Sequence, residues 1–114
     1  MVTGRFPGYV PAENETPSVY PRLDEVRDIV CTIAPGRVLS YGDIGVVLGL
    51  SPRQVGRAMS LIAIQGVPWW RVVYSDGTPA RCHDGQAPHL LGQDRIPMRG
   101  ARVDMQRARQ SLQL

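Results

Sequence analysis

Apolar residues near the start of the chain recur at the spacing of an α-helix. Four of them are separated by three, four and three positions: Leu23, Val26, Val30 and Ile33. Residues at these intervals share one helical face. Pro21 suits a first helical turn, and the Pro-Gly pair at 35–36 is a strong stop signal. The pattern predicts a helix that begins near Pro21 and ends near Ala34.

Two shorter helices are expected next, separated by a turn that contains glycine. The first is expected over 42–48, with Ser40 as its cap and Gly49 closing its end. The second is expected over 52–63, where Ser51 suits the cap. Its expected core face is formed by Val55, Met59 and Ile62. Two short helices joined in this way are typical of a helix-turn-helix, which occurs in DNA-binding proteins and in many other helical proteins.

The second half of the chain adds a small β element. Residues 69–74 are rich in β-formers and predict an extended segment, followed by a turn in which Gly77 takes a positive φ. A helix is expected over 86–95. The stretch 96–105 is expected to return to the core with Val103 as a strand residue. The fold class predicted from these patterns is mainly α with a small β element.

The two ends of the chain lack this regularity. Residues 1–20 contain three prolines and little periodic apolar content, which predicts an extended arm. Residues 106–114 are polar and arginine-bearing, as expected of a helical turn or a tail. A single domain is therefore expected over 21–105, and 114 residues leave room for one.

Composition and charge narrow the classes of function. With 43% apolar and 20% charged residues the chain is expected to be globular. No apolar run approaches the length of a membrane span, and the first ten residues do not resemble a secretory signal, so we expect a cytoplasmic protein with no membrane partner.

The charge is unevenly distributed along the chain. All 13 basic residues are arginine; residues 1–34 carry a local charge of −2 and residues 35–114 a local charge of +5. A basic domain favours a polyanionic partner, most often nucleic acid. GC-rich codon use also favours arginine over lysine, so a plain interaction domain with a compositional positive charge stays open.

No catalytic or metal-binding motif stands out. Cys31 and Cys82 are too few for a disulfide framework and match no zinc spacing. Cys82 is followed by His83, but neighbours in sequence do not by themselves form a thiolate–base pair. The residues predict no catalytic group, no metal and no cofactor.

Three segments in chain order carry a family resemblance. They are Val38-Leu39-Ser40-Tyr41-Gly42-Asp43-Ile44, Arg53-Gln54-Val55-Gly56-Arg57-Ala58-Met59 and Val67-Pro68-Trp69-Trp70-Arg71-Val72-Val73. Together they resemble the DNA-binding domain of O6-alkylguanine-DNA alkyltransferases, over roughly residues 21–104. The resemblance implies a winged-helix-like helix-turn-helix DNA-binding domain that docks in the minor groove and rotates a nucleotide out of the duplex.

The active-site motif departs from that family. Where those enzymes have Pro-Cys-His-Arg-Val, this chain has Pro68-Trp69-Trp70-Arg71-Val72. Loss of the cysteine is the mark of the alkyltransferase-like proteins, which bind alkylated guanine without repairing it; most of these keep the histidine that Trp70 replaces here. An indole is neither acidic nor nucleophilic enough to accept an alkyl group, so the chain is predicted not to be an enzyme.

The resemblance also implies which residues would meet DNA. The expected lesion pocket is lined by Tyr41, Val67, Pro68, Trp69, Trp70 and Arg81, with Trp69 as a flat wall for the base. The expected DNA contacts are Ser40, Tyr41, Pro52, Arg53, Gly56, Arg57 and Ser75. Arg53 matches the residue that fills the gap left by the rotated nucleotide, with Arg57 as the alternative, whereas Arg71 resembles a structural arginine beneath the pocket.

The function that follows is recognition of O6-alkylguanine in double-stranded DNA by a monomer, without alkyl transfer. By analogy with the family, the persistent complex would flag the lesion for nucleotide-excision repair proteins. A sequence-specific helix-turn-helix transcription regulator is the alternative, and it predicts tight binding to one undamaged site. An active alkyltransferase using Cys82 would require that cysteine to reach the pocket through a large rearrangement.

Overall fold

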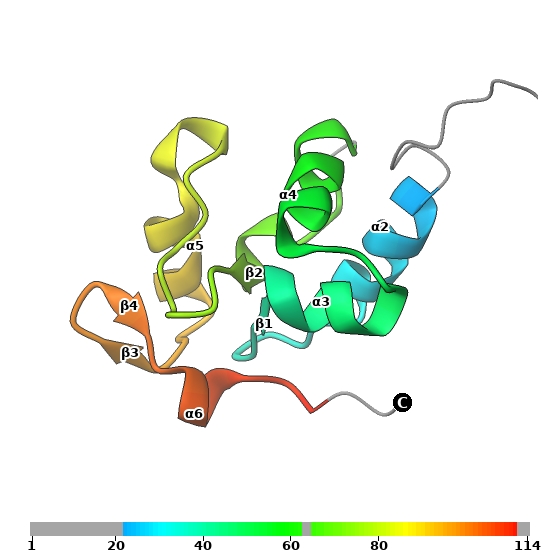
Figure 1. Ribbon diagram of the computed structural model, residues 1–114. Coiled ribbons are helices and arrows are strands. Elements are labelled where there is room, and N and C mark those ends of the chain that lie inside the picture. The colour runs from blue at the N-terminus through cyan, green and yellow to red at the C-terminus, as the bar shows by residue number, and fades with distance from the viewer. Residues whose placement is uncertain (1–21, 63–64, 112–114) are drawn as a thin grey trace, which may run out of the picture.

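The computed structural model describes residues 22–62 and 65–111, and in these ranges three helices form one half of the molecule. They are α2 (Leu23–Cys31), α3 (Tyr41–Leu48) and α4 (Pro52–Leu61). The other half contains α5 (Ala87–Gln93), the antiparallel hairpin of β3 (Met98–Arg99) and β4 (Arg102–Val103), and α6 (Met105–Ala108). Between the halves, β1 (Leu39–Ser40) pairs in parallel with β2 (Val72–Val73) (Figure 1). The prediction of a mainly α fold with a small β element is confirmed.

The predicted helix-turn-helix is present and both of its helices are capped. The Asp43 backbone N–H donates to Ser40 Oγ at 2.9 Å, and the Ser40 N–H donates to the Asp43 carboxylate at 2.9 Å. Ser51 and Gln54 make the equivalent pair of bonds at the start of α4, at 3.1 and 2.8 Å. These reciprocal bonds satisfy N–H groups that the first helical turn leaves free. Gly49 ends α3 in the left-handed region, as predicted.

Close packing at the end of α3 sets the angle between α3 and α4. The Leu50 N–H donates to the Gly45 carbonyl at 2.9 Å. A Cβ on Gly45 would lie 2.3 Å from the Leu50 carbonyl oxygen, closer than real Cβ contacts come. Glycine at this position therefore allows the tight turn that directs the start of α4 beside Tyr41.

The prediction of an extended segment over 69–74 is wrong for its first half. Trp69–Arg71 form a 3₁₀ turn, labelled η2, and only Val72 and Val73 are in a strand. The turn is closed locally, because the Trp69 N–H donates to the Val67 carbonyl at 2.8 Å and the Arg71 N–H to the Pro68 carbonyl at 3.1 Å. Side-chain anchoring by the aromatic and basic residues, described below, prevails over their β propensity.

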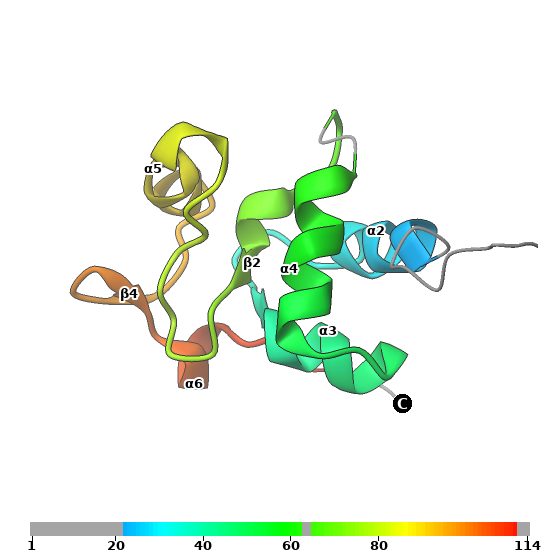
Figure 2. The same cartoon turned by 45° about the horizontal axis from the view of Figure 1, so that its top comes forward.

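The turn after β2 is fixed against the hairpin. Gly77 has φ 89°, as predicted, and a Cβ there would lie 2.3 Å from the Val103 carbonyl oxygen. The Val103 N–H donates to the Gly77 carbonyl at 2.8 Å. Val103 is buried, which confirms its expected place in the core. Beyond the turn, the chain runs between α4 and α5 in both ribbon views (Figures 1 and 2).

The C-terminal boundary of the domain lies later than predicted. Ala108 in α6 is buried, the Val38 N–H donates to its carbonyl at 3.0 Å, and the Gln110 N–H donates to the Val38 carbonyl at 2.9 Å. The segment expected as a separate piece over 106–114 is therefore part of the domain at least to Gln110. The expected arm over 1–20 lies outside the described residues. Within the described ranges, no helix has both the length and the apolar character that a membrane span requires.

Candidate nucleic-acid interface

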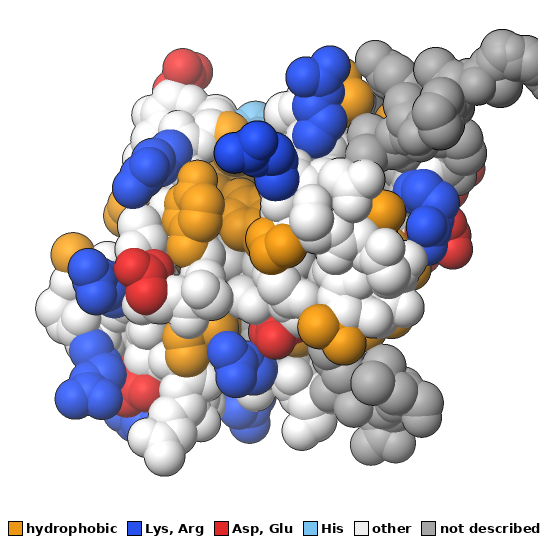
Figure 3. Space-filling model, in the orientation of Figure 1, with side chains coloured by type: hydrophobic (Ala, Val, Ile, Leu, Met, Phe, Trp, Pro, Cys, Tyr) orange, Lys and Arg blue, Asp and Glu red, His pale blue; other side chains and the backbone are white. Residues whose placement is uncertain are grey.

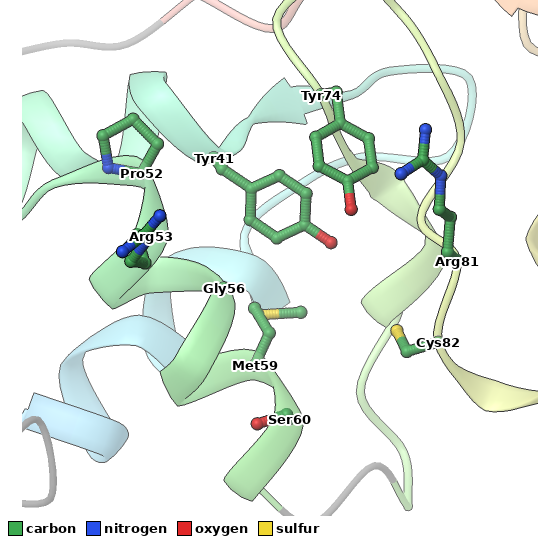
Figure 4. A pocket seen from close by; sticks show the side chains of 9 residues that line it. All are labelled: Tyr41, Pro52, Arg53, Gly56, Met59, Ser60, Tyr74, Arg81 and Cys82. Carbon is green, nitrogen blue, oxygen red and sulfur yellow. The ribbon is translucent and has the colours of Figure 1, made fainter.

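A cavity of about 410 Å³ opens between α4 and the chain segment that follows β2 (Figure 4). Nine residues line it: Tyr41, Pro52, Arg53, Gly56, Met59, Ser60, Tyr74, Arg81 and Cys82. On the face that contains α4, hydrophobic side chains lie at the centre with arginines around them (Figure 3). An apolar hollow with a cationic rim suits a flat heterocycle attached to an anionic backbone.

Aromatic rings form one side of this cavity. The Tyr41 and Tyr74 ring centroids are 5.1 Å apart, and both side chains extend toward the space in Figure 4. The Arg81 guanidinium lies 5.3 Å from the Tyr74 ring centroid, a cation–π distance. Tyr41 is 8% exposed, and burial, with the nearby Cys82 and Tyr74, raises the pKa of its phenol above the usual value. The Tyr41 hydroxyl therefore stays protonated at neutral pH and is available as a donor.

Arginines stand at the rim without acidic partners. Arg53 and Arg81 line the cavity from opposite sides (Figure 4), whereas Arg57 is exposed one helical turn beyond Arg53 and is not a lining residue. No ion pair joins any of the three to an acidic residue in the part of the chain that the structure describes. A Cβ on Gly56 would meet nothing within 4 Å, so the surface of α4 that borders the cavity is open at this residue.

The two serines predicted to contact DNA lie in different surroundings. Ser75 is exposed on the turn after β2. Ser40 is 2% exposed and its side chain is engaged in capping α3. The capping bonds hold the Ser40 side chain inside the fold, directly before Tyr41, so its predicted contact with DNA stays a prediction.

Four of the six residues predicted to line the lesion pocket lie elsewhere. Val67, Pro68, Trp69 and Trp70 border a separate depression of about 470 Å³ beside Cys31, Gly66 and Arg71. Of the six predicted residues, only Tyr41 and Arg81 line the cavity beside α4. Trp69 is 5% exposed, and the His83 ring stacks on it with centroids 4.1 Å apart. The prediction that Trp69 is an open wall is wrong for this conformation, because the indole is taken into the core and covered by the imidazole.

Trp70 and Arg71 are held by a single carboxylate, that of Asp94 at the end of α5. Asp94 accepts the Trp70 Nε1–H at 2.8 Å and two Arg71 N–H groups, from Nε at 2.6 Å and Nη2 at 3.0 Å. Arg71 also donates to the Ile33 carbonyl at 2.9 Å. The bonds from Arg71 hold the pKa of the Asp94 carboxyl below its usual value, although burial opposes them. These contacts hold the Arg71 side chain within the fold, as the resemblance implied for a structural arginine, and Trp70 is bonded to the same carboxylate.

Cys82 is a cavity residue, which the sequence reasoning did not anticipate. Its Sγ lies 2.8 Å from His83 Nδ1, and the thiol needs no large rearrangement to reach the space beside Tyr41. Burial raises the pKa of the Cys82 thiol. The protonated form therefore dominates at neutral pH, and it is a poor nucleophile.

Four lining residues were not assigned to the site from sequence: Met59, Ser60, Tyr74 and Cys82. Helical spacing could have found Ser60, which lies one turn beyond Gly56 on α4. Strand alternation gives no comparable signal for Tyr74, since it follows two buried valines at the end of β2. In the described residues no group of three or more His, Cys, Asp and Glu side chains is arranged to hold a metal ion.

Comparisons with known proteins agree with this architecture. A family model described as 6-O-methylguanine DNA methyltransferase, DNA binding domain, matches residues 21–94. Alkyltransferase-like protein 1 of Schizosaccharomyces pombe is 37% identical over 89 residues, which cover 72% of this chain and 82% of that protein.

Two crystal structures of S. pombe Atl1 have the same fold. One is a complex with damaged DNA containing O6-carboxymethylguanine; it has a TM-score of 0.68 and 26% identity, and the match covers 79% of this chain and 94% of that one. The other is a complex with DNA; it has a TM-score of 0.70 and 26% identity, with 81% and 96% covered. Both structures are similar to this chain over most of their length.

Proposed function

The chain belongs to the family defined by the DNA-binding domain of 6-O-methylguanine DNA methyltransferase, as an alkyltransferase-like protein, and we propose that it binds O6-alkylguanine in double-stranded DNA without removing the alkyl group. The observation that carries the proposal is the cavity beside α4, which has tyrosines inside it and Arg53 and Arg81 at its rim. In the part of the chain that the structure describes, neither arginine is paired with an acidic residue. Binding of damaged DNA by the structural relative S. pombe Atl1 supports it.

The base is proposed to enter the cavity after leaving the duplex. A purine inside a base stack cannot reach a space lined by Tyr41, Met59 and Tyr74, so the nucleotide has to rotate out. Unstacking costs a few kcal/mol and is least costly where the lesion already weakens base pairing. The apolar rings and the Met59 side chain then accommodate the base and its alkyl group.

Arg53 is proposed to fill the gap in the duplex. It is exposed in the first turn of α4, at the rim of the same cavity. A guanidinium is planar and carries several donors, so it can stack between bases and bond to the orphaned partner. The N-terminus of α4 adds a favourable field for a phosphate. Arg57 and Ser75 are proposed to contact phosphates on either side.

Alkyl transfer is not expected in this site. The family resemblance aligns Trp69 with the nucleophile of the enzymes, and its side chain is buried and stacked against His83. The thiol of Cys82 does line the cavity, but its raised pKa disfavours the thiolate that would attack the alkyl carbon. The complex would then persist and present the lesion to nucleotide-excision repair proteins, a step proposed from the family resemblance alone. The protein is proposed to act as a monomer in the cytoplasm.

The test is a binding titration with two duplexes that differ only in one O6-methyl group. Fluorescence anisotropy should give tighter binding to the methylated duplex, and mass analysis afterwards should find the methyl group still on the DNA. Equal binding to both duplexes would contradict lesion recognition and favour the transcription-regulator alternative. Appearance of a methyl group on the protein, abolished by Cys82→Ser, would overturn the non-catalytic part of the proposal.

A further inference from the structure

The β3–β4 hairpin carries two arginines on one exposed face. Arg99 and Arg102 are directly opposite each other in the antiparallel register, while the neighbouring pair places Val103 in the core. Like charges at facing positions of a strand pair destabilise it. A ligand with negative charge would remove that cost.

The existing acidic neighbour does not neutralise this face. Asp76 Oδ2 is 3.9 Å from Arg102 Nη2, and both side chains are more than half exposed, at 53% and 63%. An exposed pair at that distance is screened by water and contributes little. Arg99 has no acidic partner within the described residues. The hairpin therefore presents net positive charge to solvent.

The hairpin is also fixed to the proposed DNA-binding face. Gly77, two residues after Ser75, packs against the backbone of Val103 and is hydrogen-bonded to it at 2.8 Å. A second depression, of about 560 Å³, is bordered by Arg102 on the hairpin side and by Arg81 on the other. Arg81 also lines the cavity beside α4, so the two hollows meet at one residue.

We propose that Arg99 and Arg102 bind the phosphate backbone of the DNA strand outside the lesion, and so extend the interface from the cavity to the hairpin. This inference rests on the proposed function. DNA fits better than an acidic protein because the hairpin continues directly from Arg81 and the turn that carries Ser75. The contact would be independent of sequence and of the lesion, as phosphate contacts are.

The test compares the salt dependence of binding for the full chain and for the Arg99→Gln/Arg102→Gln variant. Each lost phosphate contact should reduce the slope of log affinity against log salt by about 0.9, so the variant should show a slope smaller by about 1 to 2. Affinity for methylated and unmodified duplexes should fall by the same factor, leaving their ratio unchanged. Arg102→Lys keeps the charge and should keep the slope.

The control is Arg27→Gln on α2, where the guanidinium is paired with Asp24 at 3.1 Å; it should leave the slope unchanged. Thermal unfolding of the double variant should be unchanged or shifted upward, because two facing charges are removed. A slope equal to that of the wild type in the folded double variant would overturn the inference. Absence of a preference for methylated DNA in the wild type would instead overturn the proposed function, while the slope comparison would still report on the hairpin.

Discussion

Arg71 and Arg53 both belong to the segments that resemble the alkyltransferase family, yet their surroundings differ completely. The Arg71 side chain is 13% exposed and donates to Asp94 and to the Ile33 carbonyl. Arg53 is exposed at the start of α4, beside an apolar cavity, with no acidic partner in the described ranges. The same side chain is used to hold the fold in one place and is left available for a ligand in the other. Burial and partners, rather than residue type, separate the two roles.

Trp70 belongs with the part-buried Arg71 in this comparison. It packs against both hydrophobic clusters of the domain, and its indole N–H donates to the carboxylate that binds Arg71. The indole therefore contributes both a hydrogen-bond donor and apolar surface between the two halves of the domain.

The largest effect is expected on stability, from a substitution of the Asp94 carboxylate that holds Arg71. Asp94→Asn removes the charge that compensates the part-buried Arg71 guanidinium and should cost about 1.5–3 kcal/mol in the free energy of unfolding. Urea denaturation monitored by tryptophan fluorescence would measure it. Asp76→Asn, at an exposed and distant pair, should leave the stability almost unchanged, because water screens the interaction. Equal losses in the two variants would contradict the conclusion that the Asp94 carboxylate anchors Arg71 and Trp70.

The Asp94 carboxylate should also determine how stability changes at acidic pH. The pKa of Asp94 is lower in the folded state than in the unfolded state, so its contribution is present above the unfolded value of about 4 and is lost as the pH falls through the folded value. The wild type should therefore lose stability below about pH 4 more steeply than Asp94→Asn. Parallel stability–pH curves would show that the Asp94 carboxyl is not the group responsible.

A smaller, functional effect is expected on the exposed side. Arg53→Ala should lower the preference for methylated over unmodified duplex by about tenfold, or about 1.4 kcal/mol. Stability should change by less than about 0.5 kcal/mol, because the side chain is exposed and unpaired in the described structure. Parallel anisotropy and denaturation measurements would separate the two quantities. Arg27→Ala, on α2, is the matched control and should leave the preference intact.

The smallest effect is expected at Gly56, where one substitution should change stability and DNA binding in opposite directions. Gly56→Ala should stabilise the fold by about 0.5–1 kcal/mol, since a Cβ there meets nothing within 4 Å and alanine favours the helix. The added methyl faces the proposed DNA path and should weaken binding to both duplexes. Gly45→Ala should do the opposite to the fold, because its Cβ would collide with the Leu50 carbonyl. If Gly56→Ala binds DNA as well as the wild type, then α4 does not approach the backbone closely.

The helices could be predicted from sequence because their signals are local. The caps at Ser40 and Ser51 and the stop at Gly49 all depend on residues within a few positions of one another. The helical face of α2 was equally plain from spacing, and Val26 and Val30 are buried as expected. The family resemblance added the proposed DNA-contacting surface and the proposed role of Arg53, which stay predictions.

The site itself depends on contacts between distant segments, which no local pattern encodes. The pocket was expected to be lined by the motif residues around Trp69. In the structure the His83 ring covers Trp69, and Tyr74 and Cys82 line the cavity instead. The 3₁₀ turn at Trp69–Arg71 could not be predicted for the same reason, because it is anchored by Asp94, which lies at the C-terminal end of α5. Which of these residues contact DNA stays a prediction.

Protection of the Cys82 thiol is the most direct test that the cavity holds the damaged base. In a Cys31→Ser background, which removes the exposed second cysteine, the rate of N-ethylmaleimide modification would be measured by mass spectrometry with each duplex at equal saturation. The methylated duplex should slow modification of Cys82 several-fold more than the unmodified duplex, because only a base inside the cavity covers the sulfur. Equal protection by the two duplexes, with the preference for methylated DNA intact, would place the lesion outside this cavity and contradict the account.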